Sequence, residues 1–453
     1  MRRSLFVVAL AIGLLALLAA PTLASAKTIY VSPNGTNDTA HIRAAFAAAG
    51  PGGTVQLRAG HFTINDILVA GFTGAFRGAG KSRTVIDCPD GGVSVESGFD
   101  FPYLICFRGG AITVSDMSFD ITSPAPAAPW SIPDTAHQDA TNVATILYFK
   151  GQTSATSDRV GFAGYSNDAT GYAGYNVDQS VVVEDTAACA MSGCTCTTAD
   201  GLWAWSCSDA KATVGGPCQG NVFDTPGFGC AFIDFNASQV TVSGNRFVTG
   251  ESDEVSAFGG TQGIWVYQDP GTAHSHYVIT GNTMRTVTAE AIGLADGDGT
   301  GARAIDATVT GNRLDLGTAD NPAFAGVGEG YTQNIKCLGN VLSGYATTGF
   351  AVGGDPLDDS FFPVSGWQII GNDCRRLTAD VADVWLSDGT THCLVVGGPP
   401  PTTVFDQGTA NILVNVTQVP DQAAPLLAGS STQAPTPSAP SAPVKPLMKV
   451  RPY

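Results

Sequence analysis

The chain has 453 residues and a formal net charge of −17, from 22 lysines and arginines against 39 aspartates and glutamates. Because nucleic-acid phosphates are bound by clustered lysine and arginine, this balance argues against a nucleic acid partner. The 55 glycines, with abundant threonine, serine and asparagine, are typical of an extracellular β protein.

Residues 1–26 have the pattern of a secretory signal peptide. Arg2 and Arg3 precede an apolar run over residues 5–20, and Ala24, Ser25 and Ala26 form a small-residue cleavage site. The alternative is an uncleaved anchor, but this run is short for a membrane span and no later stretch is long enough. We therefore expect a secreted or cell-surface protein without a membrane span.

Residues 38–50 predict a short helix at the start of the mature chain. Asp38 or Thr39 can cap it, Ile42, Phe46 and Ala49 share one face, and Gly50 precedes a proline. Residues 52–64 then predict a strand, a turn and a strand. A helix in this place can cover the open end of a stacked β structure.

The next segments predict early strands and then an interruption. Strand patterns occur over residues 73–87 and 109–121, and residues 123–135 are a Pro/Ala-rich loop. Residues 150–220 lack the strand pattern and contain much of the cysteine, so they predict a long excursion stapled by disulfides. The excursion contains Cys189, Cys194, Cys196, Cys207 and Cys218, and Cys230 follows it. Cys337 and Cys374, on apolar strands, can instead be buried small hydrophobic residues.

Six Gly-Asn pairs recur in the second half of the chain, each after a short apolar run. Their asparagines are Asn221, Asn245, Asn282, Asn312, Asn340 and Asn372. Glycine and asparagine tolerate positive φ, so each pair marks a tight turn after a strand. A strand-turn unit of this length cannot bury its apolar side alone and must stack on its neighbours. The repeat predicts a solenoid of parallel β rungs with the asparagines in register at one corner.

Together these segments divide the chain into three parts. Residues 1–26 are the signal peptide, residues 27–415 the β solenoid, and residues 416–453 a disordered tail rich in Pro, Ala and Ser. The segment DTAHIRAAFAAAGPGGTVQLRAGHFTI and the units GIWVYQ…YVITGNTM and GFAVGG…WQIIGND resemble secreted proteins of the pectate-lyase-like superfamily. This resemblance implies an all-β fold, a right-handed parallel β-helix with a short N-terminal capping helix. It implies little about activity, because the superfamily includes lyases, hydrolases, epimerases, tailspikes and adhesins.

Acidic residues lie at or just past the end of a second strand in nearly every rung. They are Asp234, Asp269, Asp296, Glu329, Asp355 and Asp388. Equivalent positions of parallel rungs stack at one strand spacing, so these residues predict a carboxylate column along one edge. Long loops over residues 270–277, 297–304 and 356–366 follow several of these strands, where sites are usually built. An aspartate at a strand end can also serve only to accept backbone N–H groups.

A carboxylate column suits acid–base cleavage of a glycoside or Ca²⁺ binding, so the cofactor is either none or Ca²⁺. Asp269, Asp296 and Asp298 are the candidate catalytic residues, because they lie on adjacent rungs with long loops. Arg303, His274, His276 and Tyr267 are nearby candidates for the base or the neutralising group of a lyase. Trp265 and Tyr267 can stack on sugar rings or pack as ladder residues.

The sequence therefore favours a secreted protein that binds and cleaves a polysaccharide with strand-end carboxylates. The candidate substrate-binding residues are Asp234, Trp265, Tyr267, Arg303, Glu329, Asp355 and Asp388. The catalytic signatures of polygalacturonases, pectate lyases and alginate epimerases are absent, which favours the alternative, a non-enzymatic adhesin or structural β-helix protein. The oligomeric state and the polysaccharide do not follow from the sequence.

Overall fold

A computed structural model of the chain describes its secondary structure over most of residues 26–420. The described ranges are 26–88, 103–121, 145–164, 179–197, 200–205, 217–219, 222–225, 230–235, 239–249, 262–268, 275–287, 290–296, 305–320, 322–328, 332–355, 360–361, 363–398 and 401–420. The expected signal peptide, the Pro/Ala-rich loop over 123–135 and nearly all of the expected tail lie outside these ranges.

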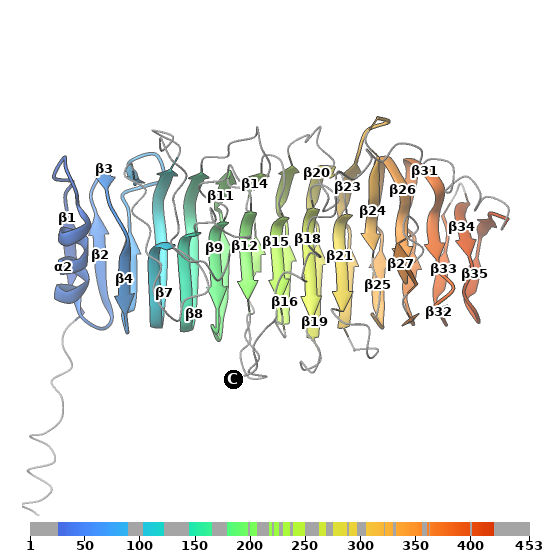
Figure 1. The fold of residues 1–453 in the computed structure, drawn as a ribbon, viewed down its shortest axis with the longest axis horizontal. Helices are drawn as coiled ribbons and strands as arrows, with labels where there is room; N and C mark the ends of the chain where they lie inside the picture. The colour runs from blue at the N-terminus through green and yellow to red at the C-terminus, as the bar shows by residue number, and fades with distance from the viewer. Residues whose placement is uncertain are drawn as a thin grey trace, which may run out of the picture.

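The strands stack side by side from one end of the molecule to the other (Figure 1). Each turn of the chain, here called a rung, adds one strand to each of three parallel sheets. The first sheet contains parts of β7 (Tyr103–Ile121) and β8 (Thr145–Gly164), together with β1 (Thr28–Val31), β2 (Gly53–Leu57), β5 (Thr73–Arg77), β10 (Cys189–Ser192), β13 (Pro217–Gln219), β16 (Gln239–Ser243), β19 (Ser275–Thr280), β22 (Ile305–Thr310), β25 (Ile335–Leu338), β30 (Gln368–Ile370), β33 (Leu394–Val396) and β35 (Ile412–Val414).

The second sheet follows the first after a tight corner. It contains parts of β7 and β8 and the first parts of β26 (Val341–Val352) and β31 (Asp373–Leu386), together with β3 (Gly60–Thr63), β6 (Thr84–Asp87), β11 (Thr195–Thr197), β14 (Val222–Thr225), β17 (Arg246–Thr249), β20 (Thr283–Val287) and β23 (Arg313–Leu316).

The third sheet closes each rung. It contains the remaining parts of β7, β8, β26 and β31, together with β4 (Ile67–Ala70), β9 (Gln179–Glu184), β12 (Asp200–Trp205), β15 (Cys230–Phe235), β18 (Gln262–Gln268), β21 (Glu290–Asp296), β24 (Ala323–Gly328), β34 (Thr402–Asp406) and β36 (Val416–Gln418). Two small pairs lie outside the stack: antiparallel β27 (Gly354–Asp355) with β28 (Ser360–Phe361), and parallel β29 (Val364–Ser365) with β32 (Thr390–Thr391).

The predicted corner of stacked asparagines is confirmed for the described copies. The Nδ2 groups of Asn245, Asn282, Asn312 and Asn340 each donate to the Oδ1 atom of the asparagine one rung further on, at 2.9–3.0 Å. The same Oδ1 atoms accept the backbone N–H of the preceding asparagine. The glycine before each asparagine has φ of 60–63°, which an L side chain rarely adopts. This asparagine ladder joins the first sheet to the second.

The predicted excursion over 150–220 is wrong for the described part of that range. The strands β9, β10, β11 and β12 pair in parallel register with β8, β13, β14 and β15, so the rungs continue. The predicted disulfides are also absent from the described residues. Cys196, Cys337, Cys374 and Cys393 are free thiols, and most are fully buried. These four cysteines act as small core residues.

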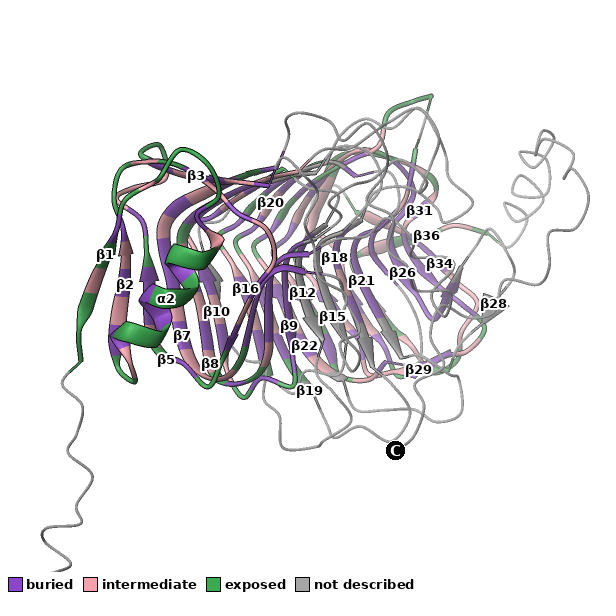
Figure 2. Ribbon diagram, turned by 60° about the vertical axis from the view of Figure 1, so that its left-hand side comes forward, coloured by how far each residue is buried: buried purple, intermediate pink, exposed green. Residues whose placement is uncertain are grey.

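The predicted helix is α2 (Thr39–Ala49), which covers the N-terminal end of the stack with Ile42, Phe46 and Ala49 buried (Figure 2). Its N-cap differs from the expectation. The Asp38 side chain makes no cap hydrogen bond and instead accepts the backbone N–H groups of Asn34 and Thr63. Asp38 therefore ties the helix start to strand β3.

The hydrophobic core fills the lumen between the three sheets and continues through the rungs. Equivalent side chains stack on each other, as in the pairs Phe107–Phe149 and Phe119–Phe162, whose ring centroids are 5.8 and 5.7 Å apart. At the C-terminal end the last paired strand ends at Gln418, three residues past the expected limit of the solenoid. The described residues include no helix with the length and apolar character needed to cross a bilayer.

Candidate functional site

The third sheet differs from the other two in that the longer connections of the chain adjoin its strands. The corner from the first to the second sheet is a two-residue turn in most rungs, because the asparagine ladder closes it. The longer connections, over residues 89–102, 122–144, 165–178, 206–216, 250–261, 269–274 and 297–304, all precede or follow a strand of the third sheet. Loops on a rigid scaffold are the usual place for binding and catalytic residues. The outward face of the third sheet is therefore the candidate functional site.

Two register columns run along this face. The first passes through Leu68, Cys106, Tyr148, Val182, Trp203, Ile233, Trp265, Gly293 and Gly328. The second passes through Ala70, Arg108, Lys150, Glu184, Trp205, Phe235, Tyr267 and Ala295. Ile264 and Val266, on either side of Trp265, are fully buried in the core. Because successive strand residues point to opposite sides, Trp265 points outward.

A buried carboxylate lies beside Trp265. Glu290 begins strand β21 and is 3% exposed. A methyl group built on Gly293 would lie 2.6 Å from Glu290 Oε2 and 3.2 Å from Trp265 Cδ1, and one built on Gly328 would approach Glu290 Oε1 equally closely. Two glycines on neighbouring strands thus make room for this carboxylate on the outward side of the sheet, where the methyl position of Gly293 adjoins both the carboxylate and the Trp265 ring.

A second polar cluster lies further toward the N-terminus in the same two columns. Tyr148 Oη donates to Glu184 Oε2, and Lys150 Nζ lies 2.6 Å from Glu184 Oε1. The side chains of Lys150 and Glu184 are 17% and 4% exposed, so the ion pair is largely removed from water. Removing one partner of such a pair leaves a buried charge without compensation.

The sequence-predicted site residues divide into three groups. Asp269, His274, Asp298, Arg303 and Glu329 lie outside the described residues. The structure gives only the strand positions of Asp234 (β15), Tyr267 (β18), Asp296 (β21) and Asp355 (β27). Trp265 is half-buried on the third-sheet face, His276 is exposed on β19 of the first sheet, and Asp388 is exposed after β31.

The single carboxylate column predicted from the sequence is wrong in register. Asp234 pairs with Val266, which pairs with Leu294, whereas Asp296 pairs with Gln268. Asp234 therefore lies two positions short of Asp296 along the strands. Asp355 pairs with Ser360 in the small antiparallel pair and lies outside the stack. Neighbouring strands end at different register positions. An alignment of the strands by their last residues therefore does not reproduce their hydrogen-bonded register.

Sequence reasoning missed Glu290, Tyr148, Lys150 and Glu184. Glu290 stands at the start of its strand, whereas the search followed strand ends. The other three lie in and beside the range interpreted as an excursion. The alternation of Tyr148 and Lys150 with core residues Leu147 and Phe149 was the available signal, since it places both on one face of a strand.

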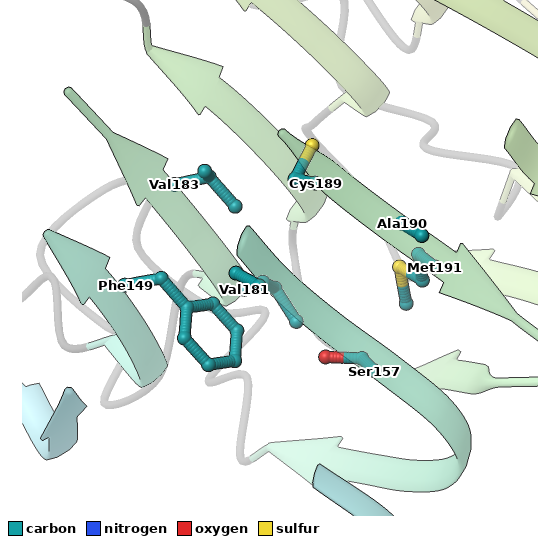
Figure 3. A pocket seen from close by; sticks show the side chains of 8 residues that line it. Phe149, Ser157, Val181, Val183, Cys189, Ala190 and Met191 are labelled. Carbon is teal, nitrogen blue, oxygen red and sulfur yellow. The ribbon is translucent and has the colours of Figure 1, made fainter. Parts of the chain in front are cut away.

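The described residues hold no group of three histidine, cysteine, aspartate or glutamate side chains that could bind a metal ion. The acidic side chains expected to share Ca²⁺ are, except for Asp388, not among those whose surroundings the structure describes. A cavity is present in the core between β8, β9 and β10 (Figure 3). Its lining is mainly apolar, with the buried hydroxyl of Ser157 as a polar exception: Phe149, Ala155, Ser157, Val181, Val183, Cys189, Ala190 and Met191. This gap belongs to the core packing and not to the outward face.

Comparison with known proteins gives the fold. No family model matches the chain, and no curated protein matches its sequence. Among solved structures, DFA-IIIase from Arthrobacter chlorophenolicus A6 in complex with DFA-III is 11% identical, with a TM-score of 0.54 over 87% of this chain and 99% of that chain. The same enzyme in complex with GF2 is 12% identical, with a TM-score of 0.50 over 84% and 93%. The A-module of the mannuronan C-5 epimerase AlgE4 from Azotobacter vinelandii is 14% identical, with a TM-score of 0.48 over 86% and 96%.

The chain is a right-handed parallel β-helix. The expected resemblance to pectate-lyase-like proteins is thereby confirmed for the fold. At these identities the likeness carries no residue roles from those enzymes to this chain.

Proposed function

We propose that this protein binds a polysaccharide along the outward face of the third sheet and cleaves it with carboxylates on that face. The observation that carries the proposal is the outward Trp265 beside the carboxylate of Glu290, over the glycine-lined surface of β21 and β24. An aromatic ring can stack on a sugar, and a carboxylate can accept hydroxyl hydrogen bonds or transfer a proton.

Further aromatic and aliphatic residues occupy register positions in the same columns on neighbouring strands. Trp203 and Ile233 precede Trp265 in its column, and Trp205 and Phe235 precede Tyr267 in the adjacent column. A run of such positions across neighbouring strands suits an extended polymer better than a small ligand. The long connections flanking the third sheet would form the walls of the binding site.

The carboxylates that can perform acid–base chemistry lie at opposite ends of the third-sheet strands. Glu290 begins β21 and Asp296 ends it. Asp298 follows two residues later in the sequence, and Asp269 follows Gln268, the register partner of Asp296. Six strand residues separate Glu290 from Asp296, a span of roughly 20 Å. Glycosidases hold their two carboxyl groups within roughly 5–10 Å of each other. Glu290 and Asp296 are therefore alternative positions of the catalytic centre and not partners.

A non-enzymatic polysaccharide-binding protein is the second candidate. The observation that favours it is the separation of the described acidic clusters. Glu184 and Trp265 are three rungs apart, through β12 and β15, which corresponds to roughly 14 Å at one strand spacing per rung. These two clusters cannot act on the same glycosidic bond.

The test compares the wild type with Trp265→Ala, Glu290→Gln and Asp296→Asn on neutral and uronic polysaccharides. New reducing ends and the absorbance of unsaturated products report cleavage, and polymer binding is measured in parallel. Tyr30→Ala is the matched control, because Tyr30 is 61% exposed on the first sheet. Cleavage lost in one carboxylate variant with binding retained locates the catalytic centre.

The non-enzymatic candidate would be supported if the wild type bound a polymer without cleaving it, Trp265→Ala lost this binding and Tyr30→Ala retained it. If the wild type bound and cleaved no polymer of the panel, both candidates would fail.

A further inference from the structure

Arginines gather on the outward face of the second sheet, away from the third-sheet face. The strands β17, β20 and β23, together with the first parts of β26 and β31, carry five arginines against two aspartates. The arginines are Arg246, Arg285, Arg313, Arg375 and Arg376, and the aspartates are Asp315 and Asp373. These strands lie side by side along one edge of the view in Figure 1. A local excess of positive charge is unexpected in a chain with 39 acidic residues against 22 basic ones.

The strand register places two of these arginines in one column and a third in the column beside it. Arg246 pairs with Thr283, which pairs with Arg313, so two rungs separate the two arginines. Arg376 on β31 pairs with Ser343 on β26, and Ser343 pairs with Asp315 on β23. Arg376 therefore lies two rungs beyond β23, the strand that carries Arg313. Two strand spacings correspond to roughly 10 Å. Arg246, Arg313 and Arg376 thus lie on every second rung, and all three are exposed. Arg376 is in the register column of Asp315, whereas the column of Arg246 and Arg313 continues through Val341 to Asp373.

Arg246 and Arg313 differ from two other exposed arginines of the chain, which form ion pairs. Arg43 lies 3.1 Å from Asp66, and Arg159 lies 2.7 Å from Asp116. Within the described residues, the side chains of Arg246 and Arg313 make no hydrogen bond or ion pair.

The acidic neighbours on the same face have other partners. Asp315 Oδ1 accepts a hydrogen bond from the Ser343 hydroxyl at 3.0 Å. Asp373 binds Arg375 through two hydrogen bonds of 2.6 and 2.8 Å, and this contact lowers the pKa of Asp373 to about 2. Asp373 also attracts the Arg376 guanidinium electrostatically, so Arg246 and Arg313 are the two guanidinium groups most available to a ligand.

We propose that the outward face of the second sheet from β17 to β31 binds an anionic polysaccharide, independently of the third-sheet face. The polymer would run along the stack, perpendicular to the strands, and present a carboxylate or sulfate group to Arg246, Arg313 and Arg376 in turn. A guanidinium group binds either anion through two parallel N–H···O bonds. Charge complementarity argues for this occupant, since Arg246 and Arg313 present two cations without an ion-pair partner, two rungs apart in one register column of a rigid sheet. A polymer with regularly spaced anionic groups matches that repeat.

The experiment compares two double variants of the full chain that remove the same number of charges. Arg246→Gln with Arg313→Gln changes the proposed surface, and Lys27→Gln with Lys336→Gln removes two exposed lysines on the first-sheet side. Binding is measured to immobilised polygalacturonate, chondroitin sulfate and uncharged dextran, at low and at physiological salt. Thermal unfolding confirms that both variants are folded.

The arginine pair contributes charge-assisted hydrogen bonds, so its loss is expected to weaken binding to the anionic polymers at least about tenfold. The lysine variant should bind as the wild type does, dextran should not compete, and salt should weaken the interaction. Because chondroitin sulfate carries both carboxylate and sulfate groups, binding to it but not to polygalacturonate would assign recognition to sulfate, and binding to polygalacturonate would show that carboxylate is sufficient.

Equal losses in the two double variants would overturn the proposal, because only net charge would then matter. Absence of binding to every anionic polymer would also overturn it. Arginine-dependent binding to duplex DNA or to phosphatidylserine vesicles, but not to the polysaccharides, would replace the proposed occupant. Trp265→Ala should keep the arginine-dependent binding to the anionic polymers even where it loses binding at the third-sheet face, because the two faces are proposed to bind independently.

Discussion

At the scale of single residues, the third-sheet face depends on two glycines. Gly293 and Gly328 occupy register positions next to Trp265, where other rungs have large side chains such as Tyr148. Any side chain at these positions would enter the space of the Glu290 carboxylate. The glycines therefore decide where this carboxylate lies and how it is presented beside the indole ring.

Gly293→Ala is expected to displace the Glu290 carboxylate, because the new methyl group would lie 2.6 Å from Oε2. Polysaccharide binding or cleavage should fall by about tenfold or more, the effect of losing a correctly placed polar group. Stability should change little if the carboxylate can move. The measurement is binding and product formation together with thermal unfolding.

Gly398→Ala is the control for this substitution, because no atom lies within 4 Å of a methyl group built there. If Gly293→Ala retained wild-type binding and activity, Glu290 would have no role in the position that it now occupies. A similar loss in both alanine variants would point to a general effect on folding.

The strands that carry the candidate site residues could be predicted from the sequence, but the register between these strands could not. The strands that carry Asp234 and Asp296 could be identified from the sequence, because the alternation of core residues is strong. The offset between these two residues along the strand direction could not be predicted, because register is set by hydrogen bonding between rungs and not by where each strand ends. No signal in the sequence indicated Glu290, since its placement depends on Gly293 three residues further along the same strand and on Gly328 on the neighbouring strand.

At the scale of elements, one corner conformation persists although its residues change. Asp116, Arg159 and Gly193 occupy the corner in earlier rungs with φ of 53–59°, close to the 60–63° of the Gly-Asn glycines. Cys194 takes the place of an asparagine there. Its Sγ accepts the backbone N–H of Val160 at 3.4 Å, as an asparagine Oδ1 does in later rungs. The sequence predicted the corner where Gly-Asn marks it and missed it where other residues adopt the same conformation, which is why the rungs of 150–220 were misread.

Asn312→Ala is expected to destabilise the β-helix by roughly 2–4 kcal/mol, because several buried backbone and side-chain groups lose their partners. Asn312 is fully buried, donates to Ile279 O and Asn340 Oδ1, and accepts from Asn282. The free energy of unfolding is measured by denaturant titration.

Asn372→Ala provides a graded comparison at the end of the ladder. Asn372 is less buried and has fewer asparagine neighbours, since its Oδ1 accepts from Asn340 and its Nδ2 donates to Cys337 O. Its loss should cost less than that of Asn312. Equal or smaller destabilisation by Asn312→Ala would show that the ladder does not act as a cooperative hydrogen-bonded unit.

The helix α2 is a second element whose contribution can be isolated. Phe46 is 5% exposed, and its ring lies 5.0 Å from that of Phe72 and 5.7 Å from that of Phe107. Phe46→Ala should cost about 3–5 kcal/mol, the range for large aromatic residues truncated in a core. Hydrogen exchange should increase first in β1 and β2. Equal protection of these strands in both proteins would mean that α2 does not close the N-terminal end of the stack.

At the scale of the whole molecule, the three sheets have different surroundings. The asparagine ladder holds the first and second sheets together through tight corners, whereas the third sheet is flanked by the long connections. The fold follows from the sequence because every rung repeats the same alternation and many repeat the same corner. The candidate sites do not follow, because they arise from side chains that only the stacking of distant segments brings together.

The core of the whole stack also contains buried thiols, which make its stability depend on pH. Burial raises the pKa of the Cys194 and Cys393 thiols to about 11, from an ordinary value of about 9. Burial raises the pKa of Cys196 and Cys337 further in the same direction. The unfolded chain therefore loses thiol protons above about pH 9, while the folded chain retains them until about pH 11.

This difference predicts that the free energy of unfolding is unaffected by these thiols at neutral pH and falls as the pH rises from about 9 to 11. Urea titrations across this range measure the decline, and Cys393→Ala is the control, because it removes one of the titrating thiols and should show a shallower decline. Mass spectrometry after alkylation at neutral pH should find Cys196 and Cys337 unmodified in the folded protein and modified in urea. Rapid alkylation of the folded chain, or identical pH profiles for the two proteins, would contradict a core in which these cysteines are buried as thiols.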